Sequence, residues 1–232
     1  MSESIKKITK AFKVDLDSRE NQSIILKSST RPFNHQVHQV NEAAKKIYKL
    51  IEGAKCSNDD IILNHNEIKE AFFSPFKPQL KNAQVFLSHS HADRNKALKV
   101  KNYLESETNR RVFIDSLFWD YKNNVLNELA KYDDTSKIED AFTLIIRESL
   151  EDMIKKCPYF VFLQSNNSVS NQGLLCITYS AWIYEELKIA HSIRESRPTP
   201  MMESMQVFHD ISPSLKHLET ITLSELSRII NP

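Results

Sequence analysis

Three short apolar runs in the chain each stop abruptly at small polar or acidic residues. They span residues 84–91, 111–116 and 159–165. Because their apolar positions follow one another without alternation, they predict strands buried on both faces of a parallel sheet. Helical spacing fills two of the intervals, over residues 93–107 and 136–156. Alternating strands and helices predict right-handed crossovers and a doubly wound α/β sheet.

Polar side chains gather where these predicted strands end. Ligands of doubly wound sheets bind just beyond the carboxyl ends of the strands. The sequence places seven polar residues there: Ser88, His89, Ser90, Asp115, Ser116, Gln164 and Ser165. We therefore expect a binding or catalytic site at this edge of the sheet.

A later segment carries a carboxylate on a helix face that is expected to be buried. Ser180 is a good N-cap and predicts a helix that runs to about residue 191 or 193. At about 100° per residue, Glu186 falls inside the apolar arc one turn after Trp182, whereas Glu185 points to solvent. A buried carboxylate must be paired, protonated or lining a cavity. The alternative is that Glu186 lies at the edge of the arc and its carboxylate reaches solvent.

The chain is expected to have three parts. Residues 1–33 are predicted to be a polar segment, residues 34–80 a helical extension, and residues 81–232 the α/β domain. Apolar positions at helical spacing predict helices over residues 35–52 and 61–73. The apolar stripe of these helices either packs on the α/β domain or pairs with another subunit.

Composition excludes several classes of function. Only two glycines occur, so neither a P-loop nor a G-x-G-x-x-G dinucleotide motif can be built. The three cysteines are widely spaced, which argues against a disulfide framework or a zinc site. His89 and His91 lack a third ligand at suitable spacing, so no metal site is expected.

The charge and hydropathy patterns predict a cytoplasmic protein. A net charge of +1 gives no field that would favour nucleic acid. The first ten residues are polar and Lys-rich, so no signal peptide is expected. No apolar run approaches the roughly 18 residues of a membrane span, so no membrane partner is expected.

Four motifs in the correct order resemble the TIR (Toll/interleukin-1 receptor) domain family, over most of residues 82–230. Val85–Arg94 is similar to the family's first strand and the loop after it, and Val112–Asp115 to its second strand. Ser180-x-Trp182-x-x-x-Glu186 is similar to the motif that carries the catalytic glutamate of TIR enzymes. Gln206–Ser214 is similar to the fourth strand with its Pro-Ser turn. There are three departures. The loop after the second strand, Ser116–Asn124, lacks glycine, a longer helical segment follows over 124–146, and little chain remains for a fifth strand beyond Thr220.

The resemblance implies a flavodoxin-like parallel sheet for residues 81–232 and cleavage of NAD in the manner of bacterial TIR enzymes. Glu186 is then the catalytic residue. The remaining site residues are expected to bind the substrate: Ser88, His89, Ser90, Arg94, Asp115, Ser116, Trp119 and Trp182. Trp182 is equally suited to the core, and Arg94 to the exposed first turn of a helix.

NAD is the expected substrate, with no further cofactor. The products implied are nicotinamide and ADP-ribose or a cyclic or conjugated ADP-ribose signal, which in bacterial relatives serves antiviral defence through a downstream effector. Self-association is expected through the loop Ser116–Asn124, where Trp119 and Tyr121 would be exposed; the alternative is that Trp119 folds inward. Two other functions remain open: a TIR adaptor that only binds other TIR domains, and a nucleoside-processing enzyme that does not use NAD.

Overall fold

The structure is a computed structural model, and it describes residues 10–28, 36–53, 64–74, 82–131, 135–172, 175–192 and 208–231. The contacts divide the chain into two compact units. The sheet unit comprises Met1–Arg31, Ala83–Asp115 and Glu151–Pro232, and the helical unit comprises Pro32–Asn82 and Ser116–Leu150. Each unit is described by itself.

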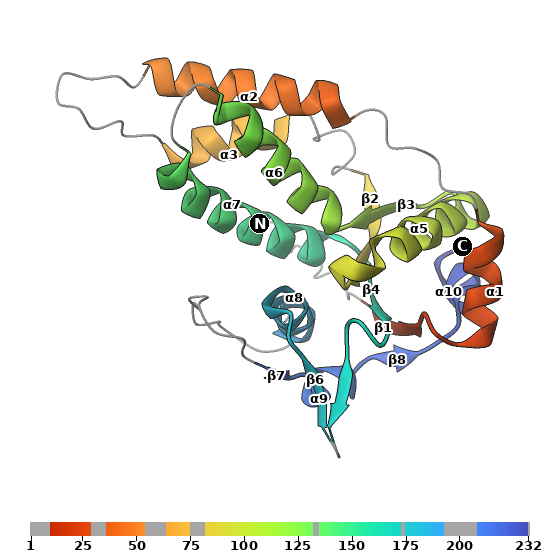
Figure 1. The fold of residues 1–232 in the computed structure, drawn as a ribbon. Coiled ribbons are helices and arrows are strands. Elements are labelled where there is room, and N and C mark those ends of the chain that lie inside the picture. Colours follow the sequence, from red (N-terminus) through yellow and green to blue (C-terminus); the bar gives the residue numbers. More distant parts are fainter. Residues whose placement is uncertain are drawn as a thin grey trace, which may run out of the picture. The chain divides into compact units, whose positions relative to one another are not determined.

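The sheet unit is built around a five-stranded, all-parallel sheet in the order β3-β2-β4-β1-β8, flanked by helices (Figure 1). Its strands are β1 (Lys10–Asp15), β2 (Ala83–His89), β3 (Arg111–Ile114), β4 (Tyr159–Gln164) and β8 (Glu219–Thr220). The three strands predicted from apolar runs are confirmed as β2, β3 and β4. This α/β architecture is compatible with a flavodoxin-like sheet.

The core of the sheet lies around β2. Phe86 of β2 pairs in register with Phe113 of β3 and with Phe160 of β4. The ring centroid of Phe86 lies 5.5 Å from that of Phe113 and 5.8 Å from that of Phe160. Each aromatic ring buried in this way contributes on the order of 1.5–3 kcal/mol relative to an exposed one. The apolar runs are thus buried on both faces, as their pattern predicts.

Strand β1 is not among the strands that the sequence predicts. It pairs with β4 along its whole length and with β8 over two residues. Phe12 and Val14 are buried, whereas Lys13 between them is not. This alternation, in a short run with charged ends, gives no continuous apolar signal. Residues 10–15 therefore lie within the sheet, whereas residues 1–33 were expected to form a polar segment outside it.

The expected fourth parallel strand over Gln206–Ser214 is wrong. The only strand described there, β7 (His209–Asp210), pairs antiparallel with β6 (Leu175–Thr178), which also pairs with β5 (Ser170–Gln172). The Pro-Ser turn forms the short helix α9 (Ser212–Leu215), and residues 206 and 207 lie outside the described ranges. Pro213 has no N–H to donate to a ladder, so the extended backbone stops before it. Strand β1 takes the place beside β4 instead.

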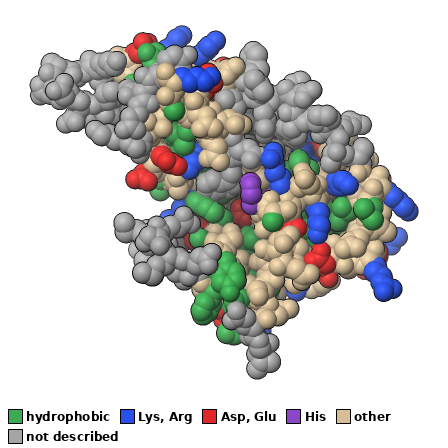
Figure 2. Space-filling view, in the orientation of Figure 1, with side chains coloured by type: hydrophobic (Ala, Val, Ile, Leu, Met, Phe, Trp, Pro, Cys, Tyr) green, Lys and Arg blue, Asp and Glu red, His purple; other side chains and the backbone are tan. Residues whose placement is uncertain are grey.

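Four longer helices complete the sheet unit: α1 (Arg19–Lys27), α5 (Arg94–Thr108), α8 (Ala181–Ser192) and α10 (Leu223–Ile230). Helices α1, α5 and α10 pack on one another, and α8 packs against β2 and β6. The Asn21 side-chain oxygen accepts the backbone N–H of Leu223 at 2.8 Å and so joins α1 to α10. The predicted helices after β2 and after Ser180 are confirmed as α5 and α8. On the face drawn in Figure 2, Lys and Arg side chains lie over the part of the sheet unit that holds α1 and α5, with fewer Asp and Glu among them.

The helical unit consists of α2 (Gln36–Gly53), α3 (His65–Phe73), α6 (Ser116–Leu129) and most of α7 (Ser136–Lys156). The last turns of α7, from Glu151 onward, belong to the sheet unit. Its core contains an aromatic cluster in which the Phe72 ring lies 4.7 Å from that of Tyr121 and 5.1 Å from that of Phe142. The helices predicted within residues 34–80, and the bounds predicted for α7, are confirmed. Of the helices in the described ranges, none is both long and apolar enough to span a bilayer.

The loop expected over Ser116–Asn124 is wrong, because these residues begin helix α6. Tyr121, expected to be exposed, is fully buried, and its hydroxyl donates a hydrogen bond to the carbonyl oxygen of Phe72 at 2.8 Å. Tyr121, Val125 and Leu129 recur at helical spacing, all on the buried face. No glycine or proline interrupts this pattern. The side chain of Trp119 lies outside the described residues.

Candidate functional site

Four buried polar side chains lie around the carboxyl ends of β2 and β3, inside the sheet unit. Ser88 and His89 are the last residues of β2, Asp115 directly follows β3, and Glu186 comes from α8, which packs on β2. All four are buried. Because β2 and β3 are parallel neighbours, their carboxyl ends lie at the same edge of the sheet. The sequence-predicted site residues on these two strands are thus brought together with Glu186.

Helix α8 places Glu186 in the interior. The Ser180 hydroxyl oxygen accepts the backbone N–H of Ile183 at 3.3 Å, which is the N-cap bond expected at this position. Ile183 and Leu187 are both buried, and Glu186 is only 1 % exposed. The adjacent Glu185 is half-buried. The buried face predicted for Glu186 is therefore confirmed, and the alternative of a carboxylate that reaches solvent is wrong.

The carboxyl group of Glu186 lies in surroundings that favour its protonated form. Among the described residues, neither of its oxygens makes a hydrogen bond of regular geometry, although Ser88 and Asp115 lie close enough to act on its proton. Burial raises the pKa of Glu186 well above its ordinary value, and the negative charge of Asp115 raises it further. Ser88 acts in the opposite direction and lowers this pKa. Glu186 therefore keeps its proton at pH values at which an exposed glutamate has lost it.

His89 and Asp115 form a buried ion pair beside Glu186. Nδ1 of His89 lies 2.6 Å from Oδ1 of Asp115, and the His89 side chain is 0 % exposed. The contact does not have hydrogen-bond geometry. Burial lowers the pKa of His89, but the Asp115 carboxylate outweighs this effect, so the pKa lies above its usual value. The more distant Asp93 acts in the same direction as Asp115, and Arg94 acts against it.

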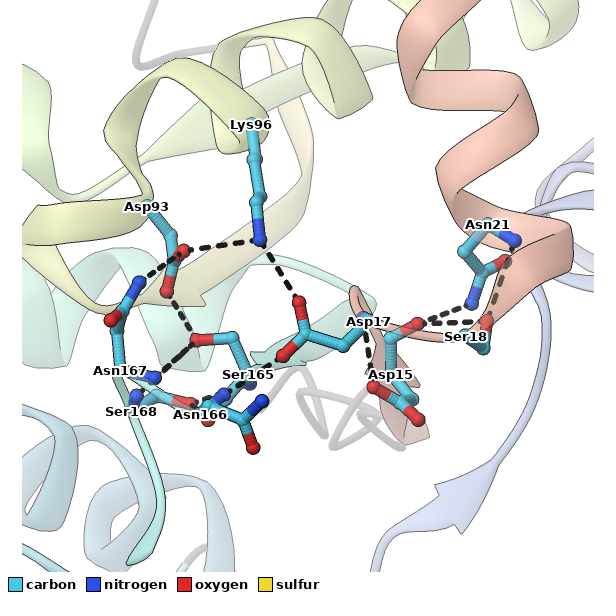
Figure 3. A network of polar contacts seen from close by, with 10 residues as sticks. All are labelled: Asp15, Asp17, Ser18, Asn21, Asp93, Lys96, Ser165, Asn166, Asn167 and Ser168. Carbon is cyan, nitrogen blue, oxygen red and sulfur yellow. Dashed lines mark hydrogen bonds and ion pairs between the residues drawn. The ribbon is translucent and has the colours of Figure 1, made fainter.

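A second polar cluster joins the loops that follow β1, β2 and β4 (Figure 3). The Asp93 carboxylate is 1 % exposed and accepts hydrogen bonds from Ser165 Oγ and from Asn167 Nδ2, the latter at 2.9 Å. Lys96 Nζ lies 3.7 Å from Asp93 and 3.0 Å from Asp17 Oδ1. Asp17 in turn accepts the backbone N–H of residue 166 at 3.0 Å. These contacts fix the three loops at the edge where the candidate site lies.

Sequence reasoning placed Ser165 at this edge of the sheet but missed Asp93, Lys96 and Asp17 of the cluster. Asp93 is the N-cap of α5, so its type is explained by helix capping, yet its side chain makes no capping bond. Asp17 follows the strand that the sequence did not predict. The signal that could have found it is the alternation of Phe12, Val14 and Leu16, which is typical of a strand.

The remaining predicted substrate-binding residues lie in different surroundings. Ser90 is half-buried, and its carbonyl oxygen accepts the backbone N–H of Asp93 at 2.8 Å. Arg94 is the first residue of α5 and is half-buried. Trp182 is half-buried, one turn before Glu186. Ser116 is buried at the start of α6, in the helical unit.

A cavity near the site does not reach the catalytic candidate. It measures about 420 Å³, lies among β1, α8 and α9, and is lined by Leu187 and His191 but not by Glu186. A second cavity, of about 630 Å³, is lined by residues of α1 and α5, with Arg111 at the start of β3. Neither of these two cavities is lined by Ser88, His89, Asp115 or Glu186.

Compared with known protein families, with curated proteins and with solved structures, the chain gives no significant match. The structure defines the chain as an α/β protein with a five-stranded parallel sheet. Its site is a buried cluster of two carboxyl groups and one imidazole at the carboxyl edge of that sheet.

Proposed function

We propose that this chain is a TIR-type enzyme that cleaves the nicotinamide–ribose bond of NAD, with Glu186 as its catalytic residue. One observation carries the proposal: the carboxyl group of Glu186 is held in the interior, only 1 % exposed, where a hydrophobic residue would pack at lower cost. Such a costly placement is typical of functional groups. The motif Ser180-x-Trp182-x-x-x-Glu186 supports the TIR assignment, as does the location at the carboxyl edge of the sheet.

The chemistry of NAD suits a single carboxylate. The nicotinamide ring of NAD is a cationic leaving group, so its departure needs no general acid. The transition state has oxocarbenium character, as in glycoside hydrolysis. An ionised Glu186 next to the anomeric carbon stabilises the developing positive charge. It also acts as a base toward the acceptor, which is water or a hydroxyl of the same molecule. The products are nicotinamide and a linear, cyclic or conjugated ADP-ribose.

The raised pKa of Glu186 has a consequence for this reaction. A proton must leave Glu186 before its negative charge can assist bond cleavage. The positive nicotinamide ring favours this loss, because a nearby opposite charge stabilises the ionised carboxylate. Since Glu186 is buried, residues around it must also move for NAD to reach it. The resemblance to TIR enzymes implies that this movement accompanies self-association, and that the product signals to a downstream effector in antiviral defence.

A non-catalytic adaptor is the second candidate, and one observation favours it. Leu175 of β6, Tyr179 directly after β6 and Phe208 directly before β7 are 44 %, 57 % and 56 % exposed. Hydrophobic side chains gather over β6 and β7 on the face drawn in Figure 2. An exposed apolar patch of this kind suits contact with a protein partner. An adaptor, however, gains nothing from the cost of burying Glu186.

Two neighbouring glutamates provide the test. We expect Glu186→Gln to abolish nicotinamide release from NAD, because the substitution keeps the shape and removes the charge. Glu185→Gln is the matched control on the same helix turn and should retain activity. Nicotinamide is measured by liquid chromatography, with circular dichroism to compare the folds. Equal activity of the two variants would contradict the proposal.

A further inference from the structure

We propose that His89 is a positioning residue that controls the ionisation of Glu186 through Asp115. In this view the buried imidazolium cancels the charge of Asp115 and so makes the ionised form of Glu186 accessible at lower pH. The inference rests on the proposed function for its catalytic meaning. The electrostatic coupling itself is a property of the folded chain and can be measured without substrate.

Among the described residues, Asp115 is the partner that the geometry gives His89. Its side chain is 0 % exposed, so the ring does not lie on the surface that a substrate would first meet. Nδ1 faces Asp115 at 2.6 Å, and Nε2 is buried without a hydrogen-bond partner. His89, predicted from the sequence to grip the substrate, is thus placed to act on Asp115.

Asp115 acts on both the His89 imidazole and the Glu186 carboxyl. Its negative charge raises the pKa of Glu186, and the same charge raises that of His89. Two carboxylates that face each other in a buried site resist simultaneous ionisation and come to share one proton. A protonated His89 beside Asp115 weakens this repulsion, because the His89–Asp115 pair is then neutral.

Two other charged groups act on His89 in opposite directions. Asp93 favours the imidazolium and Arg94 opposes it. Asp93 is itself engaged by Lys96 at 3.7 Å and by two hydrogen bonds. For Glu186, the groups that act on its proton are Asp115 and Ser88. The balance at Glu186 therefore depends mainly on whether Asp115 is neutralised, and His89 is the cation closest to it in the described network.

Two substitutions should act in opposite directions. His89→Asn keeps an N–H near the position of Nδ1 and removes the positive charge. Asp115→Asn removes the negative charge and keeps the shape. We expect the first to increase the proton affinity of Glu186 about tenfold or more and the second to decrease it by a similar factor. A purely structural role of His89 would lower stability without producing this opposition.

The test is a direct titration of Glu186. Protein labelled with ¹³C at the glutamate side-chain carboxyl is titrated by NMR, and Glu186→Gln identifies the resonance. The expected result is a titration midpoint at higher pH in His89→Asn and at lower pH in Asp115→Asn. Either variant alone tests the idea if the other does not fold. An unchanged midpoint, or shifts in the same direction, would overturn the proposal.

Activity profiles then separate this proposal from the proposed function. If NAD is cleaved, the acidic limb of kcat against pH should move to higher pH in His89→Asn and to lower pH in Asp115→Asn, each relative to wild type. If the NMR midpoints shift as expected and no protein cleaves NAD, the coupling stands and the proposed function fails. If NAD is cleaved and the midpoints do not move, the proposed function stands and the role of His89 is refuted.

Discussion

The Asp93 cluster should be a main source of stability at the functional edge of the sheet. Asp93 is 1 % exposed and accepts bonds from Ser165 and Asn167, with Lys96 at 3.7 Å. Asp93→Ala removes the carboxylate that accepts these hydrogen bonds, so the Ser165 and Asn167 donors and the Lys96 ammonium lose this partner. Each hydrogen bond to a charged group contributes about 1.5–3 kcal/mol, and breaking a buried charged pair costs about 3–5 kcal/mol. We expect a loss of about 3 kcal/mol, since the donors recover part of this from other partners.

The loss is measurable by thermal unfolding followed with circular dichroism. For a chain of this size, about 1 kcal/mol changes Tm by roughly 2–4 °C, so Asp93→Ala should lower Tm by about 6–12 °C. Asp17→Ala is the control in the same cluster. Its carboxylate also contacts Lys96, but the side chain is 28 % exposed, so water replaces its bonds at lower cost. We expect the control to lose less than about 1.5 kcal/mol.

The reasoning from burial is refuted if Asp93→Ala unfolds within about 1 °C of the wild type, or if Asp17→Ala is the more destabilised of the two. In the first case the loops after β1, β2 and β4 would be held by their backbone contacts alone. In the second case the exposed ion pair, rather than the buried carboxylate, would hold this edge of the sheet.

Two further predictions concern stability. Burial raises the pKa of Glu186 in the folded protein above its value in the unfolded chain. Between these two pKa values, Glu186 is ionised in the unfolded state and still protonated in the folded state. The free energy of unfolding therefore falls as pH rises through this range. Glu186→Gln removes this penalty, so its stability advantage over wild type should grow with pH in urea titrations; an advantage that is constant with pH would argue against the raised pKa. In the helical unit, Tyr121→Phe deletes the bond to the Phe72 carbonyl and should cost about 1–2 kcal/mol in the same titrations, whereas an unchanged midpoint would show that this bond contributes nothing.

Much of the fold follows from local pattern. The runs that became β2, β3 and β4 are apolar throughout, which is the direct consequence of burial on both faces. The buried position of Glu186 follows from the spacing of Ile183 and Leu187 on the same helix. These features depend on neighbouring residues in the sequence, so the sequence alone predicts them.

The features that were missed depend on the rest of the fold. Strand β1 alternates apolar residues with Lys13 because Phe12 and Val14 lie on its buried face and Lys13 lies on the opposite, less buried face. The region Ser116–Asn124 was expected to be a loop by resemblance to TIR domains, although Tyr121 and Val125 lie at helical spacing. The partners of Asp93 are more than seventy residues away along the chain, so no local pattern indicates them.

The central claim, that this chain cleaves NAD, is tested most directly by incubating the purified protein with NAD and analysing the products. A series of protein concentrations should be used, because the proposed opening of the site around Glu186 accompanies self-association. The account predicts release of nicotinamide together with an ADP-ribose product, with specific activity rising as concentration increases. NAD recovered intact at every concentration, from protein shown to be folded, would contradict it.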